Sequence, residues 1–230
     1  MNLKKALRAN ANPARAAVSQ RFFKTGKGQY GEGDVFIGLT VPDCRLIAKK
    51  FVNLPLIEIA DHLKSEIHEE RLIALLILVE QYNRNVADRK SIFDFYLANL
   101  KYVNNWDLVD LTAHNILGDY LLDKDKDILC GLAKSNNLWE RRISIVSTFG
   151  FIKNNRFEDT LKIVKMLLAD KHDLIHKACG WMLREVGKRD EMVLKGFLKQ
   201  HYKKMPRTML RYAIERFPEK ERKAHLAGAV

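Results

Sequence analysis

The sequence has few cysteines and no long unbroken apolar run. Its three cysteines, Cys44, Cys130 and Cys179, form no CxxC pair, and this sparse usage favours reduced thiols in a cytoplasmic protein. The longest unbroken apolar run, residues 72–79, is far too short to cross a bilayer. Because it is apolar on every side, it predicts a helix buried in the middle of a stack. No apolar signal-peptide core follows the basic start, so nothing indicates secretion. We therefore expect a cytoplasmic protein with no membrane association.

Signatures of metal and nucleotide chemistry are also missing. The seven histidines occur without HExxH and without cysteines at ligand spacing. Neither a G-x-S-x-G elbow nor a P-loop is present. The G-x-G-x-x-G run at residues 26–31 follows no strand and opens no βαβ unit, so it predicts a flexible basic loop rather than a dinucleotide site. The sequence therefore predicts no metal and no other cofactor.

Acidic residues are scarce at both ends of this chain, whose formal net charge is +12. Counting Lys and Arg against Asp and Glu, residues 1–60 carry ten against four (+6), residues 61–170 fifteen against seventeen (−2), and residues 171–230 fifteen against seven (+8). A polyanion held between two basic ends, with a carboxylate at the centre, would need this layout. The alternative is a basic surface that only keeps the protein soluble.

The first 24 residues hold six basic residues and no acid, with a break at Asn12 and Pro13 that suits a short helical hairpin. A mitochondrial transit peptide has this composition, and so does a helix that lies against phosphates. We expect one domain with N-terminal helices (1–24), a Gly-rich loop (25–41), stacked helical hairpins (42–217) and a flexible tail (218–230). The helix after the loop is expected to start at Pro42 and Asp43.

Strand signals are nearly absent, and apolar residues recur at helical spacing instead. Comparable helix starts follow one another at spacings in the thirties, at His68, Trp106, Trp139, Ile175 and Pro206. This pattern predicts an all-α fold, a HEAT-like helical-repeat solenoid (an ARM-repeat superhelix) that is C-shaped and presents one helix of each pair on a concave binding face. The commonest use of such a solenoid, a protein-binding scaffold, is one alternative for its function.

The strongest candidate for chemistry is Asn-Trp-Asp-Leu-Val-Asp at residues 105–110. On a helix, Trp106 and Asp110 are four residues apart and share a face. Asp107, in the first turn, suits the positive end of the helix dipole, which is a structural role. Asp110 is therefore the candidate catalytic carboxylate. The alternative is that it merely pairs with His114, four residues further on.

Two further motifs add tryptophans and basic residues on later repeats. The first, Trp-Glu-Arg-Arg at residues 139–142, opens a helix in which Trp139 is better explained as core. The second, residues 177–185, contains Gly180 in mid-helix, which costs about 1 kcal/mol relative to Ala and therefore predicts a close approach there. Three tryptophans, a carboxylate and several arginines on successive repeats make a candidate site.

These motifs give the sequence a family resemblance over residues 3–216. Trp-Asp-x-Val-Asp at 106–110, Trp-x-x-Arg at 139–142 and Lys-Ala-x-Gly-Trp-x-Leu-Arg-Glu at 177–185 resemble the AlkD family of HEAT-like-repeat DNA alkylation-repair glycosylases. The resemblance implies a concave DNA-binding face and excision of alkylated purines from double-stranded DNA. It also implies a monomer that needs neither a cofactor nor an obligate protein partner.

The resemblance also assigns roles to individual residues. Asp110 would be the catalytic carboxylate, Trp106 and Trp181 would cradle the lesion, and Arg142 would hold the DNA backbone beside it. Other backbone contacts would come from basic residues along the chain, namely Arg45, Arg141, Lys177, Arg184, Arg207 and Arg211.

The sequence departs from the family pattern near its N-terminus. Phe22 stands where the family archetype has a tyrosine that faces the lesion, so the ring is kept and the hydroxyl is lost. The Gly-rich segment at residues 26–38 is longer than in the archetype. A branch that lacks the DNA-penetrating N-terminal helix looks inactive, whereas residues 14–24 keep that helix here, which favours activity. A catalytically silent binder of DNA structure is the remaining alternative.

Overall fold

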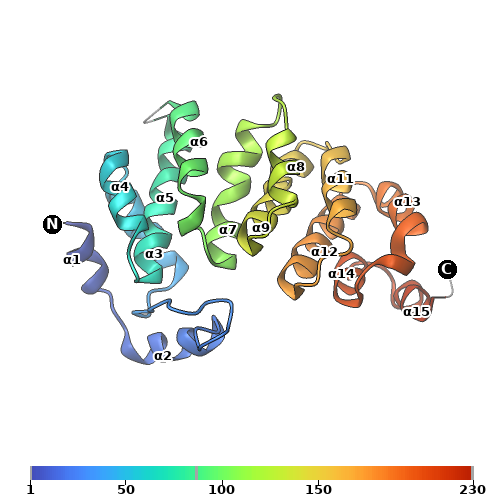
Figure 1. Ribbon diagram of the computed structural model, residues 1–230, viewed down its shortest axis with the longest axis horizontal. Coiled ribbons are helices and arrows are strands. Elements are labelled where there is room, and N and C mark those ends of the chain that lie inside the picture. Colours follow the sequence, from blue (N-terminus) through green and yellow to red (C-terminus); the bar gives the residue numbers. More distant parts are fainter. Residues whose placement is uncertain (1, 86–87, 229–230) are drawn as a thin grey trace. The chain divides into compact units, whose positions relative to one another are not determined.

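The protein is described from a computed structural model that places residues 2–85 and 88–228. The chain divides into two compact units, Met1–Thr112 and Ala113–Val230, which we call unit 1 and unit 2. Within the placed residues, helices are the only regular elements, apart from an isolated bridge between Val35 and Ile67 (Figure 1). The all-α prediction is therefore confirmed.

Unit 1 is built around α5, whose residues 71–79 are buried on every side. This is the helix that the apolar run predicts, because a helix without a polar face needs neighbours all round. Helices α3 and α4 pack against it on one side and α6 on another. The elements of unit 1 are α1 (Leu3–Arg8), α2 (Pro13–Phe22), α3 (Val41–Lys50), α4 (Leu56–Leu63), α5 (His68–Arg84), α6 (Arg89–Ala98), η1 (Leu100–Tyr102) and α7 (Trp106–Ala113).

Unit 2 begins where α7 passes directly into a π-helical turn, and its longest helix, α12, packs against α9, α13 and α14. The helix starts expected from the sequence are found within two residues of their predicted positions. The elements are η2 (His114–Gly118), α8 (Asp127–Ala133), α9 (Leu138–Ser147), α10 (Phe149–Lys153), α11 (Glu158–Met166), α12 (Asp173–Gly187), α13 (Glu191–His201), η3 (Tyr202–Lys204), α14 (Arg207–Ala213) and α15 (Glu219–Ala227).

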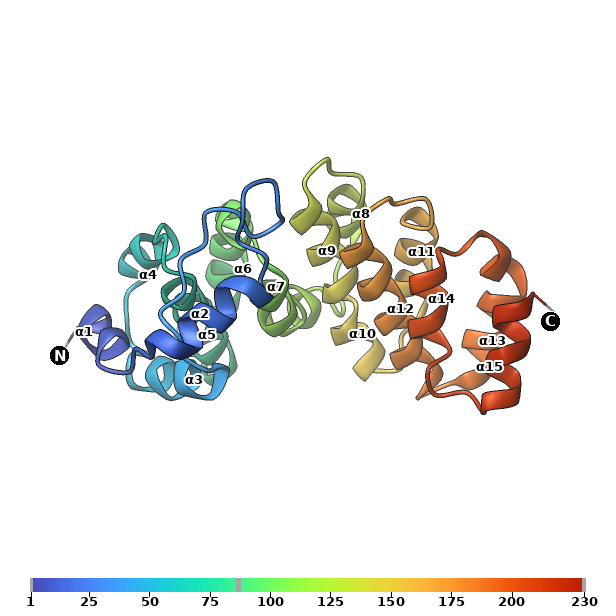
Figure 2. The ribbon, with the colours of Figure 1, turned by 90° about the horizontal axis from the view of Figure 1, so that it is seen from below.

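The N-terminal helices begin close to the predicted positions, at Pro13 and Val41. The side chain of Asn12 caps α2, with Pro13 at the first helical position, where its missing N–H costs nothing. Thr40 and Asp43 form a reciprocal capping box at the start of α3. Helix α2 and the loop after it lie along one side of unit 1, over α3 and α5 (Figures 1 and 2).

The close approach predicted at Gly180 is present, and the neighbour is another helix. A Cβ added to Gly180 would lie 2.5 Å from the carbonyl oxygen of Met209 on α14. A similar close approach of two backbones occurs where η2 crosses α10, because a Cβ on Gly150 would lie 2.7 Å from the backbone of Gly118. Glycine is needed at both crossings because the backbones themselves are in contact.

The flexible tail expected after residue 217 contains a helix instead. Helix α15 follows Pro218, carries Glu219 and Glu221 in its first turn, and ends at Gly228 in the left-handed conformation. His225, in its last turn, is buried. Acidic residues at the start, histidine at the end and a terminal glycine are all helix signals, so the prediction of a tail gave them too little weight.

Candidate functional site

Helix α7 positions the two residues singled out for chemistry. The Asn105 side chain accepts a hydrogen bond from the backbone N–H of Trp106 at 2.8 Å, where the helix begins. Trp106 and Asp110 are both half-buried and lie one turn apart. Burial raises the pKa of Tyr96, and the negative charge of Asp110 raises it further. The Asp110 carboxylate on α7 is therefore close enough to the buried Tyr96 hydroxyl on α6 to raise its pKa.

Three aromatic rings meet at the start of α7, and we call Phe22, Phe23 and Trp106 the aromatic platform. Phe23 stacks on Trp106 with ring centroids 5.0 Å apart and planes 6° apart. Phe22 meets Trp106 edge-on at 5.9 Å, and 64% of Phe22 is exposed. The structure therefore brings together two predicted site residues, Phe22 and Trp106, from opposite ends of unit 1. The sequence reading did not include Phe23, although it is the direct neighbour of Phe22.

Asp107 has a different role from the one that its position at the helix start predicts. Its side chain is buried, and Oδ2 lies 2.8 Å from Nε2 of His68 on α5. Oδ1 accepts a hydrogen bond from the backbone N–H of Leu108. The interpretation as a simple first-turn residue is thus incomplete, because Asp107 is also one partner of a buried ion pair. Asp110 is the more exposed of the two carboxylates of the motif.

The ion pair of Asp107 belongs to a larger buried ion cluster, formed by Asp34, His68, Arg71, Asn105 and Asp107. Nδ1 of His68 lies 3.0 Å from Asp34. Arg71 and the Asn105 amide also donate to Asp34, at 2.5 and 2.9 Å. Burial lowers the pKa of His68, but the charge of Asp107 and hydrogen bonds to both carboxylates outweigh it and raise the pKa to about 9.

The cations of the cluster lower the pKa of Asp34, whereas the carboxylates raise that of His68. Burial raises the pKa of this carboxyl, but its hydrogen bond with His68 and the charge of Arg71 prevail, so the pKa is lowered overall. Asp34 thus stays ionised opposite the buried cation of Arg71. The sequence reading missed the whole cluster.

The loop between α2 and α3 is fastened to α5 by a second buried carboxylate. Glu69 accepts hydrogen bonds from the backbone N–H groups of Ile37, Gly38 and Leu39, the shortest being 2.7 Å to Gly38. Gly38 has a φ of +89° and touches α2, since a Cβ there would lie 2.1 Å from the Asn12 carbonyl. These hydrogen bonds hold the Gly-rich segment in place against α5. The segment in turn determines where α2 and its phenylalanines lie.

In unit 2, Trp181 lies in a cluster of aromatic rings and cations. Its ring is 5.7 Å from Phe149, whose other neighbours are the edge-on ring of His114 and the ammonium of Lys153, 4.6 Å from the ring centroid. Arg189 lies 5.9 Å from the same centroid. Burial lowers the pKa of Lys153, and repulsion from Arg189 lowers it further. Phe149, Lys153 and Arg189 are candidate site residues that the sequence reading missed.

Arg142 is less accessible than a phosphate contact requires. Its residue is only 5% exposed, and its guanidinium donates to the backbone carbonyl of Leu174 in the first turn of α12. A DNA contact by Arg142 stays a prediction, and it would need this hydrogen bond to be exchanged. Trp139, three residues earlier, is buried in the core as predicted.

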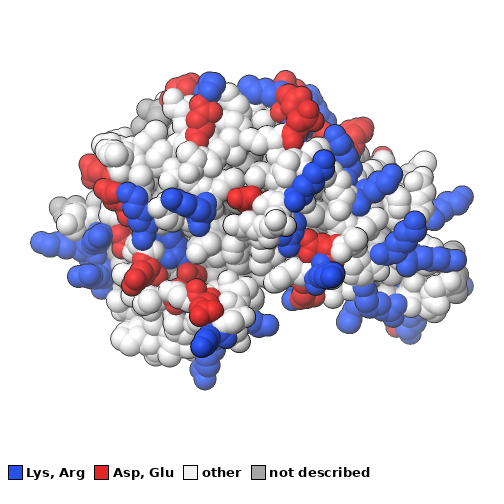
Figure 3. Space-filling view, in the orientation of Figure 1, with Lys and Arg blue, Asp and Glu red and all other residues white. Residues whose placement is uncertain are grey.

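The predicted backbone-contact residues fall into two groups. Three of them join different segments of unit 2, namely Arg141 with Asp170, Arg184 with Glu215, and Arg207 with the Leu226 carbonyl, whereas Lys177 pairs with Asp173 on the exposed surface of α12 itself. Arg45 and Arg211 are exposed, and no ion pair among the described residues involves either of them. Arg211 lines a small pocket of about 330 Å³ with Lys177 and Tyr212. Lys and Arg crowd the surface over α13 to α15 (Figure 3).

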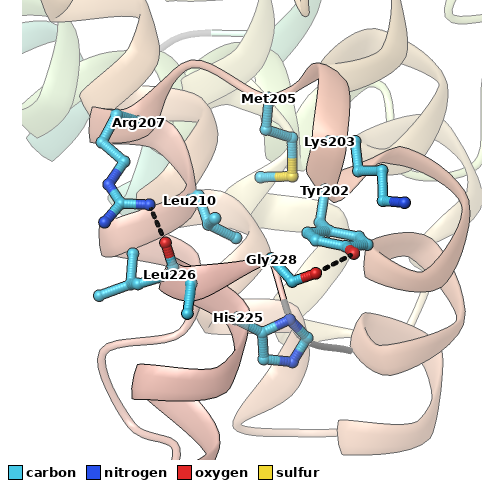
Figure 4. A pocket seen from close by; sticks show the side chains of 9 residues that line it. Tyr202, Lys203, Met205, Arg207, Leu210, His225, Leu226 and Gly228 are labelled. Carbon is cyan, nitrogen blue, oxygen red and sulfur yellow. Dashed lines mark hydrogen bonds between the residues drawn. The ribbon is translucent and has the colours of Figure 1, made fainter.

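The C-terminal end of unit 2 carries an open pocket of about 430 Å³ between α14, α15 and η3 (Figure 4). Its lining is joined by two hydrogen bonds, from Arg207 to the Leu226 carbonyl and from the Tyr202 hydroxyl to the Gly228 carbonyl. These bonds tie α15 to the rest of the unit. The Arg207 guanidinium is thus part of a structural joint.

Other kinds of site find little support in the described residues. No group of three or more His, Cys, Asp and Glu there has an arrangement that could hold a metal ion. None of the helices in the same residues has the length and apolarity required to cross a membrane. The three cysteines are free thiols, two of them buried.

Comparison with solved structures shows the class of fold. The chain is similar to a predicted DNA alkylation repair enzyme from Enterococcus faecalis, with a TM-score of 0.72 and 17% sequence identity, over 91% of this chain and 98% of that one. The predicted helical-repeat fold is confirmed. A comparison with curated proteins finds no match. Residues 3–217 match the DNA alkylation repair enzyme family, and the chain belongs to that family.

Proposed function

We propose that the protein is a monofunctional DNA glycosylase that excises cationic alkylated purines, of the 3-methyladenine and 7-methylguanine type, from double-stranded DNA. The observation that carries the proposal is the arrangement on α7, where the half-buried Asp110 lies one helical turn from Trp106. Membership of the DNA alkylation repair enzyme family supports it. The proposed enzyme acts as a cytoplasmic monomer without a cofactor.

Asp110 would act by charge. A purine alkylated at N3 or N7 is already cationic, so its glycosidic bond is weak and no general acid is needed to expel it. Positive charge then grows on the sugar. A carboxylate about 4 Å away stabilises that charge by about 4 kcal/mol at an effective dielectric constant near 20, which corresponds to roughly a thousandfold in rate. The same carboxylate would orient the attacking water.

Recognition would use aromatic faces. A tryptophan face favours a cationic base over a neutral one by about 0.5–2 kcal/mol, and Trp106 and Trp181 are the candidates. The exposed ring of Phe22, in edge contact with Trp106, would supply a further apolar surface to the lesion nucleotide. Basic residues of both units, including Arg45, Lys153 and Arg189, would contact phosphates and position the duplex without reading its sequence.

The direct test measures the release of free 7-methylguanine and 3-methyladenine from methylated duplex DNA. Wild-type protein is expected to release both bases, and Asp110→Asn should release neither at a comparable rate. Asp94→Asn is the matched control, because it removes an exposed carboxylate from α6 in the same unit. Salt-sensitive duplex binding without release would indicate a silent DNA binder. Absence of duplex binding would favour a protein scaffold.

A further inference from the structure

The buried ion cluster joins three segments of unit 1 that are far apart in the sequence. Asp34 comes from the loop after α2, His68 and Arg71 from the first turn of α5, and Asn105 and Asp107 from the start of α7. His68 is the central member, because its two ring nitrogens lie against carboxylates of two different segments. The His68 side chain therefore links the α2–α3 loop to the start of α7.

The geometry shows which form of His68 makes this link. Nδ1 is 3.0 Å from Asp34 and Nε2 is 2.8 Å from Asp107, and ionised carboxylates can only accept hydrogen bonds. Both ring nitrogens must therefore carry a proton, and only the imidazolium has two N–H donors. With Arg71, the cluster then contains two cations and two anions, so its charges balance inside the protein.

The link continues into the aromatic platform by stacking. The His68 ring stacks on Phe36 with centroids 4.3 Å apart, and Phe36 stacks on Phe23 at 4.7 Å. Phe23 in turn lies parallel to Trp106. The backbone at Trp106 is held between Asn105 and Asp107, which both belong to the cluster. Trp106 is therefore fixed to His68 twice, through its ring and through its flanking residues.

We infer that His68 is a positioning residue, whose imidazolium fixes the faces of Trp106 and Phe22 by binding the α2–α3 loop and the start of α7 at the same time. The inference deepens the proposed function, on which it rests for what the platform contacts. The positioning itself requires only the contacts described above. Loss of the second proton would remove the hydrogen bond from His68 to one of the two carboxylates and would loosen the platform.

The charges around His68 are consistent with a proton that leaves only at alkaline pH. Asp34 approaches from the loop, Arg71 and Glu69 belong to its own helix, and Asp107 comes from α7. On α3, burial raises the pKa of the Cys44 thiol, and the charges of Glu69, Asp43 and Asp107 raise it further, so the thiol stays neutral. The pKa of His68 itself is raised to about 9, against the lowering effect of burial.

The test follows Trp106 directly, without requiring enzymatic activity. The protein is labelled with 5-fluorotryptophan, and the signal of Trp106 is assigned as the one that Trp106→Phe removes. Between pH 6 and pH 10.5, the ¹⁹F shift of Trp106 in the wild type is expected to change with a midpoint near 9. In His68→Gln this titration should disappear, because a glutamine side chain does not titrate in this pH range.

His62→Gln is the matched control. His62 also binds a carboxylate of unit 1, with Nδ1 2.7 Å from Glu70. Unlike His68, it does not belong to the stack that runs through Phe36 and Phe23 to Trp106. The Trp106 titration should persist in that variant. The inference is overturned if the Trp106 signal does not titrate in the wild type, or if it titrates unchanged in His68→Gln. The wild-type measurement remains a valid test even if His68→Gln fails to fold.

A second measurement separates this inference from the proposed function. His68→Gln should lower single-turnover excision from methylated duplex by about tenfold to a hundredfold, the usual effect of a misplaced contact. Its affinity for undamaged duplex should stay within about twofold, because phosphate contacts are made elsewhere. A His68-dependent titration in a protein without excision activity would contradict the proposed function and leave the positioning role intact. Normal excision by His68→Gln would contradict the positioning role.

Discussion

The ring of Phe23 lies parallel to the indole of Trp106, with centroids 5.0 Å apart and an angle of 6° between the planes. One of these residues ends the N-terminal helical segment, and the other begins α7. The stack covers one face of Trp106, so that a ligand ring could stack only on the opposite face. The proposed recognition of a cationic base by Trp106 would therefore depend on where the N-terminal segment lies.

The sharpest prediction concerns Asp110. Asp110→Asn keeps the shape of the side chain and removes its charge, so single-turnover excision of 7-methylguanine should fall by about two to three orders of magnitude. Binding to undamaged duplex should persist or tighten slightly, because one repulsion with phosphate is lost. Near-normal excision by this variant, with Asp94→Asn also normal, would show that the catalytic carboxylate lies elsewhere.

Asp107→Asn should affect stability far more than a helix-start residue would. Removing a charge at a helix terminus costs about 0.3–1 kcal/mol, whereas breaking a buried ion pair costs about 3–5 kcal/mol. Because Asp107 is paired with the buried His68, we expect a loss near 3 kcal/mol in urea unfolding. A loss below about 1 kcal/mol would mean that the pair contributes little.

Stability should fall at alkaline pH because of His68. Its folded-state pKa is raised from 6.5 to about 9, so its contribution is fully present below pH 6.5 and is lost as the pH rises through 9. The shift corresponds to a loss of up to about 3 kcal/mol. Urea unfolding at pH 6.5 and pH 10 measures it, and the difference should shrink in His68→Gln. Equal pH dependence in both proteins would contradict the assignment.

Phe22→Ala should reduce excision without unfolding the protein. The side chain is 64% exposed, so the core loses little. If Phe22 stacks on or beside the lesion nucleotide, its removal should cost about 1–3 kcal/mol of interaction, roughly tenfold or more in rate. Val18→Ala, on the same helix and 57% exposed, is the control. The same small effect in both variants would remove Phe22 from the site.

Lys153→Ala and Arg189→Ala should each weaken duplex binding for damaged and undamaged DNA alike. Two cations held beside the Phe149 ring repel each other, and a phosphate would relieve that repulsion. Each substitution is expected to reduce the slope of log K against log [salt] by about one. Lys199→Ala on α13, where the cation is exposed, serves as the control. An unchanged slope would exclude these two residues from the interface.

The sequence predicted what depends on local pattern. The buried helix α5 follows from an apolar run with no polar face, the starts of α2 and α3 from Pro13 and Pro42, and the shared face of Trp106 and Asp110 from their spacing of four residues. The predicted close approach at Gly180 was also found, because a glycine within a good helix needs a reason. Such features are readable because neighbours in the sequence remain neighbours in the fold.

The buried ion cluster could not be read in that way. Asp34 and Asn105 share a hydrogen bond across 71 positions, and no local periodicity relates a loop carboxylate to the start of a distant helix. The role of Arg142 was obscured for a similar reason. The family resemblance implies a phosphate contact for this arginine, but its burial against Leu174 becomes apparent only when α9 and α12 are packed together.

The crossing at Gly180 has a consequence for its neighbour Trp181. Most side chains in a core can shift by a few tenths of an ångström because the atoms around them are flexible. Here the limit is set by backbone against backbone, since even a methyl group would meet the Met209 carbonyl at 2.5 Å. The position of the Trp181 backbone relative to α14 is therefore fixed by direct contact between the two helix backbones. Repacking of side chains elsewhere can change that position very little.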